Sequence, residues 1–114
     1  MRILIACLLL LSANFAYANC ARPGVAPEIP NGATADEAGM KAGREAIQAY
    51  VNQLEAYKAC LKQQADQATA DVSDQQKSTW LAQGDAALDY ANVLANRYSA
   101  QLKLFKERTA PPAK

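Results

Sequence analysis

The sequence predicts an all-α protein: an antiparallel hairpin of two long helices, about residues 35–70 and 74–108, with an extended N-terminal strap. No proline occurs between these limits, and the large apolar residues recur there at helical spacing in two stripes. Three prolines fall within residues 19–33, where each fixes φ and removes a hydrogen-bond donor. The chain thus divides into a strap over 19–33, a helical hairpin over 34–109 and a tail over 110–114 that we expect to be flexible.

Residues 1–18 have the pattern of a secretory signal peptide. Arg2 provides the positive start, an apolar run follows, and Ala16 and Ala18 form a small-x-small cleavage site. The apolar run is shorter than the about 20 residues that a membrane-spanning helix needs. We expect cleavage after Ala18, a mature chain with no integral membrane segment, and a location in the periplasm or outside the cell. The alternative is an uncleaved N-terminal anchor.

The charge balance gives no indication of a polyanionic partner. The chain has 12 basic and 11 acidic side chains, and loss of Arg2 with the leader makes the two numbers equal. A mature chain of zero formal charge has no overall field that attracts nucleic acid. We therefore expect no nucleic-acid partner.

The cysteines favour one disulfide. Cleavage removes Cys7 and leaves Cys20 and Cys60, and an even number in a small exported protein indicates a bridge. Two independent buried thiols are the alternative. The strap has a suitable length, because Cys20 to Thr34 spans ~43 Å at the polyproline rise and Thr34 to Cys60 spans ~39 Å along a helix. A strap that turns at Asn31-Gly32 and runs antiparallel to the first helix would bring Cys20 to Cys60.

The first helix has a predicted start and a one-sided apolar stripe. Thr34 as N-cap and Glu37 three residues later form a capping box. The large apolar residues of the stripe recur every seven residues, as in a coiled coil: Met40, Ile47, Leu54 and Leu61. The stripe ends in a polar stretch, where Ser73 with Gln76 forms a second capping box, so we expect a turn near 70–73. A single continuous helix of about 75 residues is the alternative, since alanine and glutamine tolerate helix there.

The second helix carries a second apolar stripe with small residues between its large ones. The stripe consists of Trp80, Leu81, Leu88, Leu94, Ala95, Tyr98, Leu102 and Phe105, and its seven-residue repeat of Leu81, Leu88, Ala95 and Leu102 is expected to face the core. A two-helix hairpin has a core one layer thick, so we expect flanks at Val51, Ala87 and Leu94 to stay partly open. These flanks predict a homodimer, as in a four-helix bundle.

Residues 20–61 resemble a known family. The chain is similar to a family of small exported proteins of Gram-negative bacteria in a few short motifs: Cys20, the run PEIPNGA over 27–33, Met40, Tyr50 and the run AYKACL over 56–61. The resemblance implies export and a disulfide. It implies no activity, and residues 62–114 carry none of its motifs.

The side-chain inventory argues against catalysis. The chain has no histidine, which excludes Ser-His and Cys-His nucleophiles and imidazole metal sites. Paired cysteines leave no thiolate, and no glycine-rich phosphate loop occurs. The aspartates near the hairpin tip lack calcium-loop spacing, so we expect them to be solvated helix surface: Asp66, Asp71, Asp74, Asp85 and Asp89. We expect no enzyme activity, no metal and no cofactor.

Aromatic side chains are the candidate contact residues. Tyr50, Tyr57, Trp80 and Tyr98 are expected in the core with polar atoms at its rim, and Tyr90 is the better interface candidate if exposed. The leading functional hypothesis is a non-enzymatic cell-envelope protein that acts through protein–protein contacts. The alternatives are a periplasmic holdase-like chaperone, and a protein that binds a small apolar ligand between its helices with tyrosines at the mouth.

Overall fold

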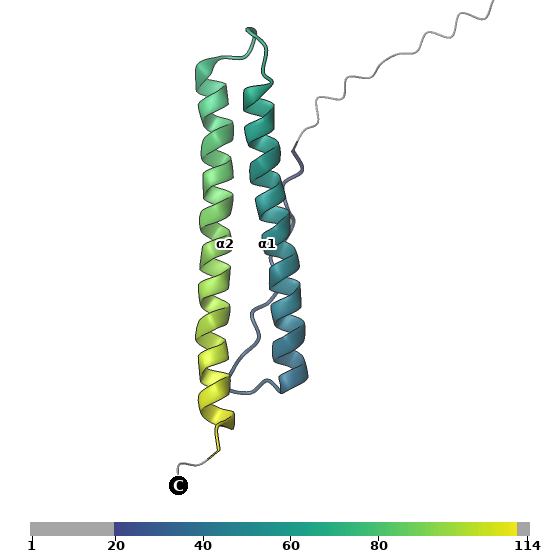
Figure 1. Cartoon of the computed structure of the whole chain (residues 1–114), viewed down its shortest axis with the longest axis vertical. Coiled ribbons are helices and arrows are strands. Elements are labelled where there is room, and N and C mark those ends of the chain that lie inside the picture. Colours follow the sequence, from purple (N-terminus) through teal and green to yellow (C-terminus); the bar gives the residue numbers. More distant parts are fainter. Residues whose placement is uncertain (1–19, 112–114) are drawn as a thin grey trace, which may run out of the picture.

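A computed structural model describes residues 20–111 of the chain. It contains two antiparallel helices, α1 (Glu37–Asp66) and α2 (Asp74–Thr109), and the strap lies beside α1 (Figure 1). No strand occurs within residues 20–111, so the predicted all-α hairpin is confirmed. The predicted signal peptide and residues 112–114 of the predicted tail lie outside the described residues.

The N-terminus of α1 differs from the prediction. Asp36 is the N-cap, and its carboxylate accepts a hydrogen bond of 2.7 Å from the amide of Gly39. The predicted capping box of Thr34 and Glu37 is therefore wrong. The carbonyl of Asn31 accepts hydrogen bonds from the amides of Thr34 and Ala35, so these residues belong to a turn that precedes the helix. Asp36 is the first residue that can cap α1, and its negative charge is favourable there.

The break between the helices is confirmed, although it is longer than predicted. α1 ends at Asp66 rather than near residue 70, and α2 begins at Asp74. Ser73 is the N-cap of α2, where its hydroxyl accepts a hydrogen bond of 3.1 Å from the amide of Gln76. The second predicted cap is correct in this respect, and the alternative of one continuous helix is excluded.

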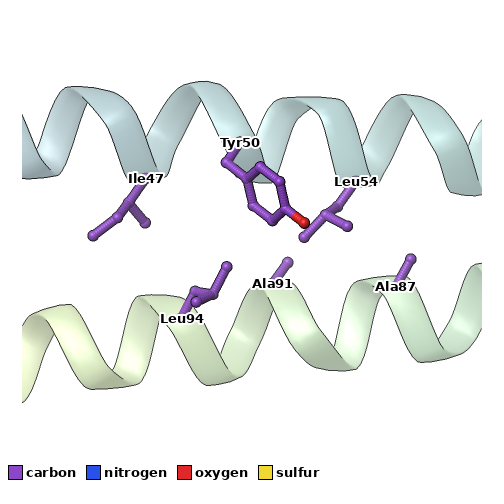
Figure 2. Packing of buried hydrophobic residues seen from close by; sticks show 6 residues of the cluster. All are labelled: Ile47, Tyr50, Leu54, Ala87, Ala91 and Leu94. Carbon is purple, nitrogen blue, oxygen red and sulfur yellow. The ribbon is translucent and has the colours of Figure 1, made fainter. Parts of the chain in front are cut away.

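The centre of the core joins large side chains of α1 to small ones of α2. Figure 2 shows Ile47, Tyr50 and Leu54 facing the residues of α2 that complete this cluster: Ala87, Ala91 and Leu94. Leu94 is only 2% exposed. The small residues let the helices approach closely, because a methyl group on Gly84 would lie 3.1 Å from Cγ of Lys58. Burial therefore depends on fit between the helices as well as on side-chain size.

This packing corrects two expectations about α2. Leu81 was expected in the core but is 43% exposed, and Ala95 is also exposed. Conversely, Ala87 and Leu94 were expected to stay partly open and are buried. The large α1 side chains need short partners, so α2 turns its alanine-rich face toward α1 and its Leu81 row away.

The disulfide and the strap follow the predicted arrangement, with one addition. Cys20 and Cys60 form a disulfide with 5.6 Å between their Cα atoms. The strap packs along α1, where Ala26 and Ile29 contact the core cluster. It then reaches the C-terminal end of α2, as Figure 1 shows. There the amide of Gly32 donates a 2.9 Å hydrogen bond to the side-chain oxygen of Gln101, so the strap bridges both helices.

Arg108 completes the attachment of the strap turn to α2. Its guanidinium donates hydrogen bonds to the carbonyls of Gly32 and Ala35, and it lies 5.4 Å from the ring centre of Phe105. The turn fits closely, because a methyl group on Gly32 would overlap the carbonyl of Gln101. The strap is consequently held at its disulfide and at its turn.

Candidate functional site

One hollow of the described chain lies under the strap. This strap groove has a volume of about 440 Å³ and is bounded by residues 22–26 of the strap, by α1 and by α2. The two helices contribute Tyr50, Leu54, Tyr57, Gln83, Ala86, Ala87 and Tyr90. The volume falls within the range of small-molecule sites in proteins.

The strap groove is open because the strap crosses it without filling it. Val25, the largest apolar strap residue here, is 99% exposed and does not pack into the hollow. Gly24 has no side chain, and a methyl group built on it would meet nothing within 4 Å. The short side chains of Ala86 and Ala87 leave space on the α2 side. The hydroxyl of Tyr50 donates a 2.7 Å hydrogen bond to the carbonyl of Gly24, which holds the strap in place above the hollow.

Three of the predicted aromatic residues come together at this groove. Tyr50 is buried in its floor, and the ring of Tyr90 meets it edge-on at 6.3 Å between ring centres, with an interplanar angle of 89°. Tyr90 is partly exposed, as an interface residue should be, and Tyr57 is half-buried. Edge-to-face geometry is favourable for aromatic rings and leaves the outer face of Tyr90 available.

The other two predicted aromatic residues lie elsewhere. The hydroxyl of Tyr98 donates a 3.1 Å hydrogen bond to the carbonyl of Met40, and the ring packs against the core cluster. Tyr98 is therefore a core residue with a satisfied hydroxyl. Trp80 is half-buried on α2 and does not line the strap groove.

The polar groups of the groove are positive or neutral. Arg22 is the charged residue of the lining, which contains no carboxylate. Within residues 20–111, Arg22 makes no ion pair, and the hydroxyls of Tyr57 and Tyr90 make no hydrogen bond. These groups are available to a bound molecule.

Sequence reasoning missed Arg22, although the length comparison contained a signal for it. Four extended residues separate Cys20 from Gly24, a span that matches about eight helical residues. Counting back from Cys60 places Gly24 near Asn52, close to its observed partner Tyr50. Arg22 could therefore have been assigned to the neighbourhood of Tyr57. The contribution of α2 had no comparable signal.

A second feature lies on the groove side of the molecule: a row of apolar side chains along α2 that includes Tyr90 of the groove. Tyr90, Val93 and Leu104 are each between 40% and 44% exposed. Their spacing places them on one face of the helix, and Arg97 shares that face because it is seven residues from both Tyr90 and Leu104. We call these four residues the α2 row.

Neither a metal site nor a membrane span is found in the part of the chain that the structure describes. The aspartates near the tip are exposed, and no three acidic, cysteine or histidine side chains of residues 20–111 gather as metal ligands would. Neither α1 nor α2 contains an apolar stretch long enough to cross a membrane.

Comparison with known proteins identifies no relative. No protein-family model, curated protein or solved structure that was compared matches the chain. The resemblance over residues 20–61 therefore stays a prediction.

Proposed function

We propose that the chain is an exported, non-enzymatic protein of the cell envelope that binds another protein through the α2 row. The observation that carries the proposal is the gathering of Tyr90, Val93 and Leu104 on one face of α2. Single exposed apolar residues are ordinary on protein surfaces, but a row along one helix face is typical of a contact surface. Val25 adds a further exposed apolar side chain on the strap.

The chemistry of the α2 row favours an amphipathic helix with acidic residues as its partner. Apolar residues at helical spacing are the usual anchors when one helix lies along another. Arg97 is exposed within the row and makes no ion pair among residues 20–111. An acidic residue on the partner would pair with it and set the register of the two helices.

The disulfide supports the exported location. Disulfides form and persist in oxidising compartments such as the periplasm, and they are rare where thiols are kept reduced. The Cys20–Cys60 bridge joins the strap to α1, so it contributes directly to the fold that presents the row.

Photo-crosslinking in a periplasmic extract tests this function. A photoreactive residue at Val93 should give one defined adduct, and a matched residue at Ala95, which faces away from the row, should not. Mapping the adduct should place the cross-link on a partner helix with acidic residues, and Arg97→Glu should reduce its yield. Equal labelling from Val93 and Ala95 would contradict the proposal, and an adduct with a second copy of the chain would replace the foreign partner by a homodimer.

A further inference from the structure

The strap groove suggests a binding site for a small molecule beside the α2 row, with which it shares Tyr90. We infer that it binds a small amphipathic carboxylate, with the apolar part of the ligand between the tyrosines and its carboxylate at Arg22. The argument has three parts: the shape of the floor, the charge at the rim, and the way the strap is held.

The floor suits a flat or narrow apolar body. Tyr50, Leu54 and Ala87 are buried in the floor of the groove, and the ring of Tyr90 stands edge-on to that of Tyr50. A ligand ring or chain would cover the outer face of Tyr90 and the exposed edge of Tyr57, which are the partly exposed apolar parts of the lining. Burial of this apolar surface supplies the non-specific part of the affinity.

The rim favours one negative charge. Arg22 has no carboxylate partner among the described residues, and none of the lining residues is acidic. A carboxylate can accept two parallel hydrogen bonds from one guanidinium and balances its charge, whereas a cation is repelled and a neutral acceptor forms weaker hydrogen bonds with this group. The hydroxyls of Tyr57 and Tyr90 and the amide of Gln83 are further hydrogen-bonding groups of the lining.

The strap holds Arg22 between two fixed points. The disulfide at Cys20 lies two residues before it, and the hydrogen bond from Tyr50 to Gly24 lies two residues after it. The backbone at Arg22 therefore loses little freedom when a ligand binds, and this lowers the entropic cost of binding. The disulfide ties this part of the strap to α1, so reduction should weaken the site even if the helices remain paired.

Isothermal titration calorimetry of the oxidised mature chain tests the inference with 2-naphthoate and decanoate as probes and 2-naphthalenemethanol as the neutral control. We expect saturable binding of at least one acid with one molecule per chain. Binding of 2-naphthoate alone would assign the site to aromatic acids, and binding of decanoate alone would assign it to fatty acids. Arg22→Gln should weaken acid binding about fivefold, as for a partly exposed ion pair, and should leave the neutral control unchanged.

A matched pair of substitutions locates the site. Ala86→Leu places a larger side chain in the groove and should weaken binding at least tenfold, whereas Ala95→Leu, on the opposite face of α2, should have no effect. Both alanines are exposed and leucine tolerates helix well, so circular dichroism should show equal helicity. As a readout without substitution, the NMR signals of the Tyr57 and Tyr90 rings should shift when the unaltered protein is titrated with the acid that binds. If neither acid binds saturably, or if the Ala86→Leu and Ala95→Leu variants bind the acids with equal affinity, the proposed site is wrong. If the Arg22→Gln variant binds the acids as tightly as the unaltered protein does, the assignment of the ligand carboxylate to Arg22 is wrong.

Discussion

The attachment of the strap turn to α2 can be tested at Gly32. In a Gly32→Ala variant the added methyl group would overlap the carbonyl oxygen of Gln101 and lie 2.7 Å from its carbonyl carbon and 3.0 Å from the amide nitrogen of Phe105. These atoms belong to the backbone of a helix and cannot rotate away. The turn must therefore move outward from α2.

The movement breaks two hydrogen bonds. One joins the amide of Gly32 to Gln101 at 2.9 Å, and the other joins the guanidinium of Arg108 to the carbonyl of Gly32 at 3.3 Å. With about 1 kcal/mol for the neutral bond and about 2 kcal/mol for the charged one, we expect the free energy of unfolding to fall by about 3 kcal/mol. In a domain of this size such a loss lowers Tm by about 12–24 °C.

Urea and thermal unfolding of the oxidised protein, followed by circular dichroism, measure this loss. Gly24→Ala is the matched control, because it lies in the same strap and a methyl group there meets nothing within 4 Å. Neither glycine has a positive φ, so alanine strains the backbone at neither position. If the two variants unfold within about 0.5 kcal/mol of each other, the reasoning that the turn is fitted against α2 is refuted.

Four further predictions follow from the structure and the sequence. Replacing Cys20 and Cys60 by serine should cost about 4 kcal/mol through the lost loop constraint, measured by urea unfolding; an unchanged midpoint would argue against the bridge. Tyr50→Phe should cost about 1 kcal/mol because its hydroxyl bonds Gly24, whereas Tyr90→Phe should cost nothing measurable. Mass spectrometry of the exported form without reductant should show cleavage after Ala18 and one intact disulfide. Light scattering after size exclusion tests the predicted homodimer: a dimer would favour a second copy of the chain as the occupant of the α2 row, and a monomer at micromolar concentration would exclude the homodimer.

The apolar stripe of α1 was predictable from its spacing alone. Met40, Ile47, Leu54 and Leu61 are all buried, as their seven-residue repeat indicates. These are the large apolar residues of one narrow face, and the rest of that helix is mainly polar or small. When a single face can exclude water, the sequence of the helix decides which face is buried.

The same reasoning failed on α2 because two of its faces are apolar. The row through Leu81 and Ala95 and the row through Ala87, Ala91 and Leu94 both have helical spacing, and the larger residues drew the prediction to the first. The observed core uses the second. Close packing against the large side chains of α1 decided which of the two rows is buried. The sequence of α2 alone does not show which side chains of α1 will face it.

The helix start shows the same limit on a smaller scale. Thr34 and Asp36 are both good N-cap residues, and the capping-box pattern favoured Thr34. Thr34 and Ala35 belong to the turn that begins at Asn31, so Asp36 is the residue that caps α1. That turn is held by contacts of Gly32 with α2, which are remote in sequence.

The sequence by itself determined two helices, the break between them, a strap that cannot be helical and a pairing of Cys20 with Cys60. The helices and their break depend on periodicity and local backbone preferences, the strap depends on its prolines, and the pairing depends on chain length. Only the tertiary structure decided that the strap reaches α2, that α2 buries its small residues, and that a hollow remains beneath Gly24 and Val25. These features depend on which surfaces meet across long sequence separations, and such contacts are settled by the fit of side chains in three dimensions.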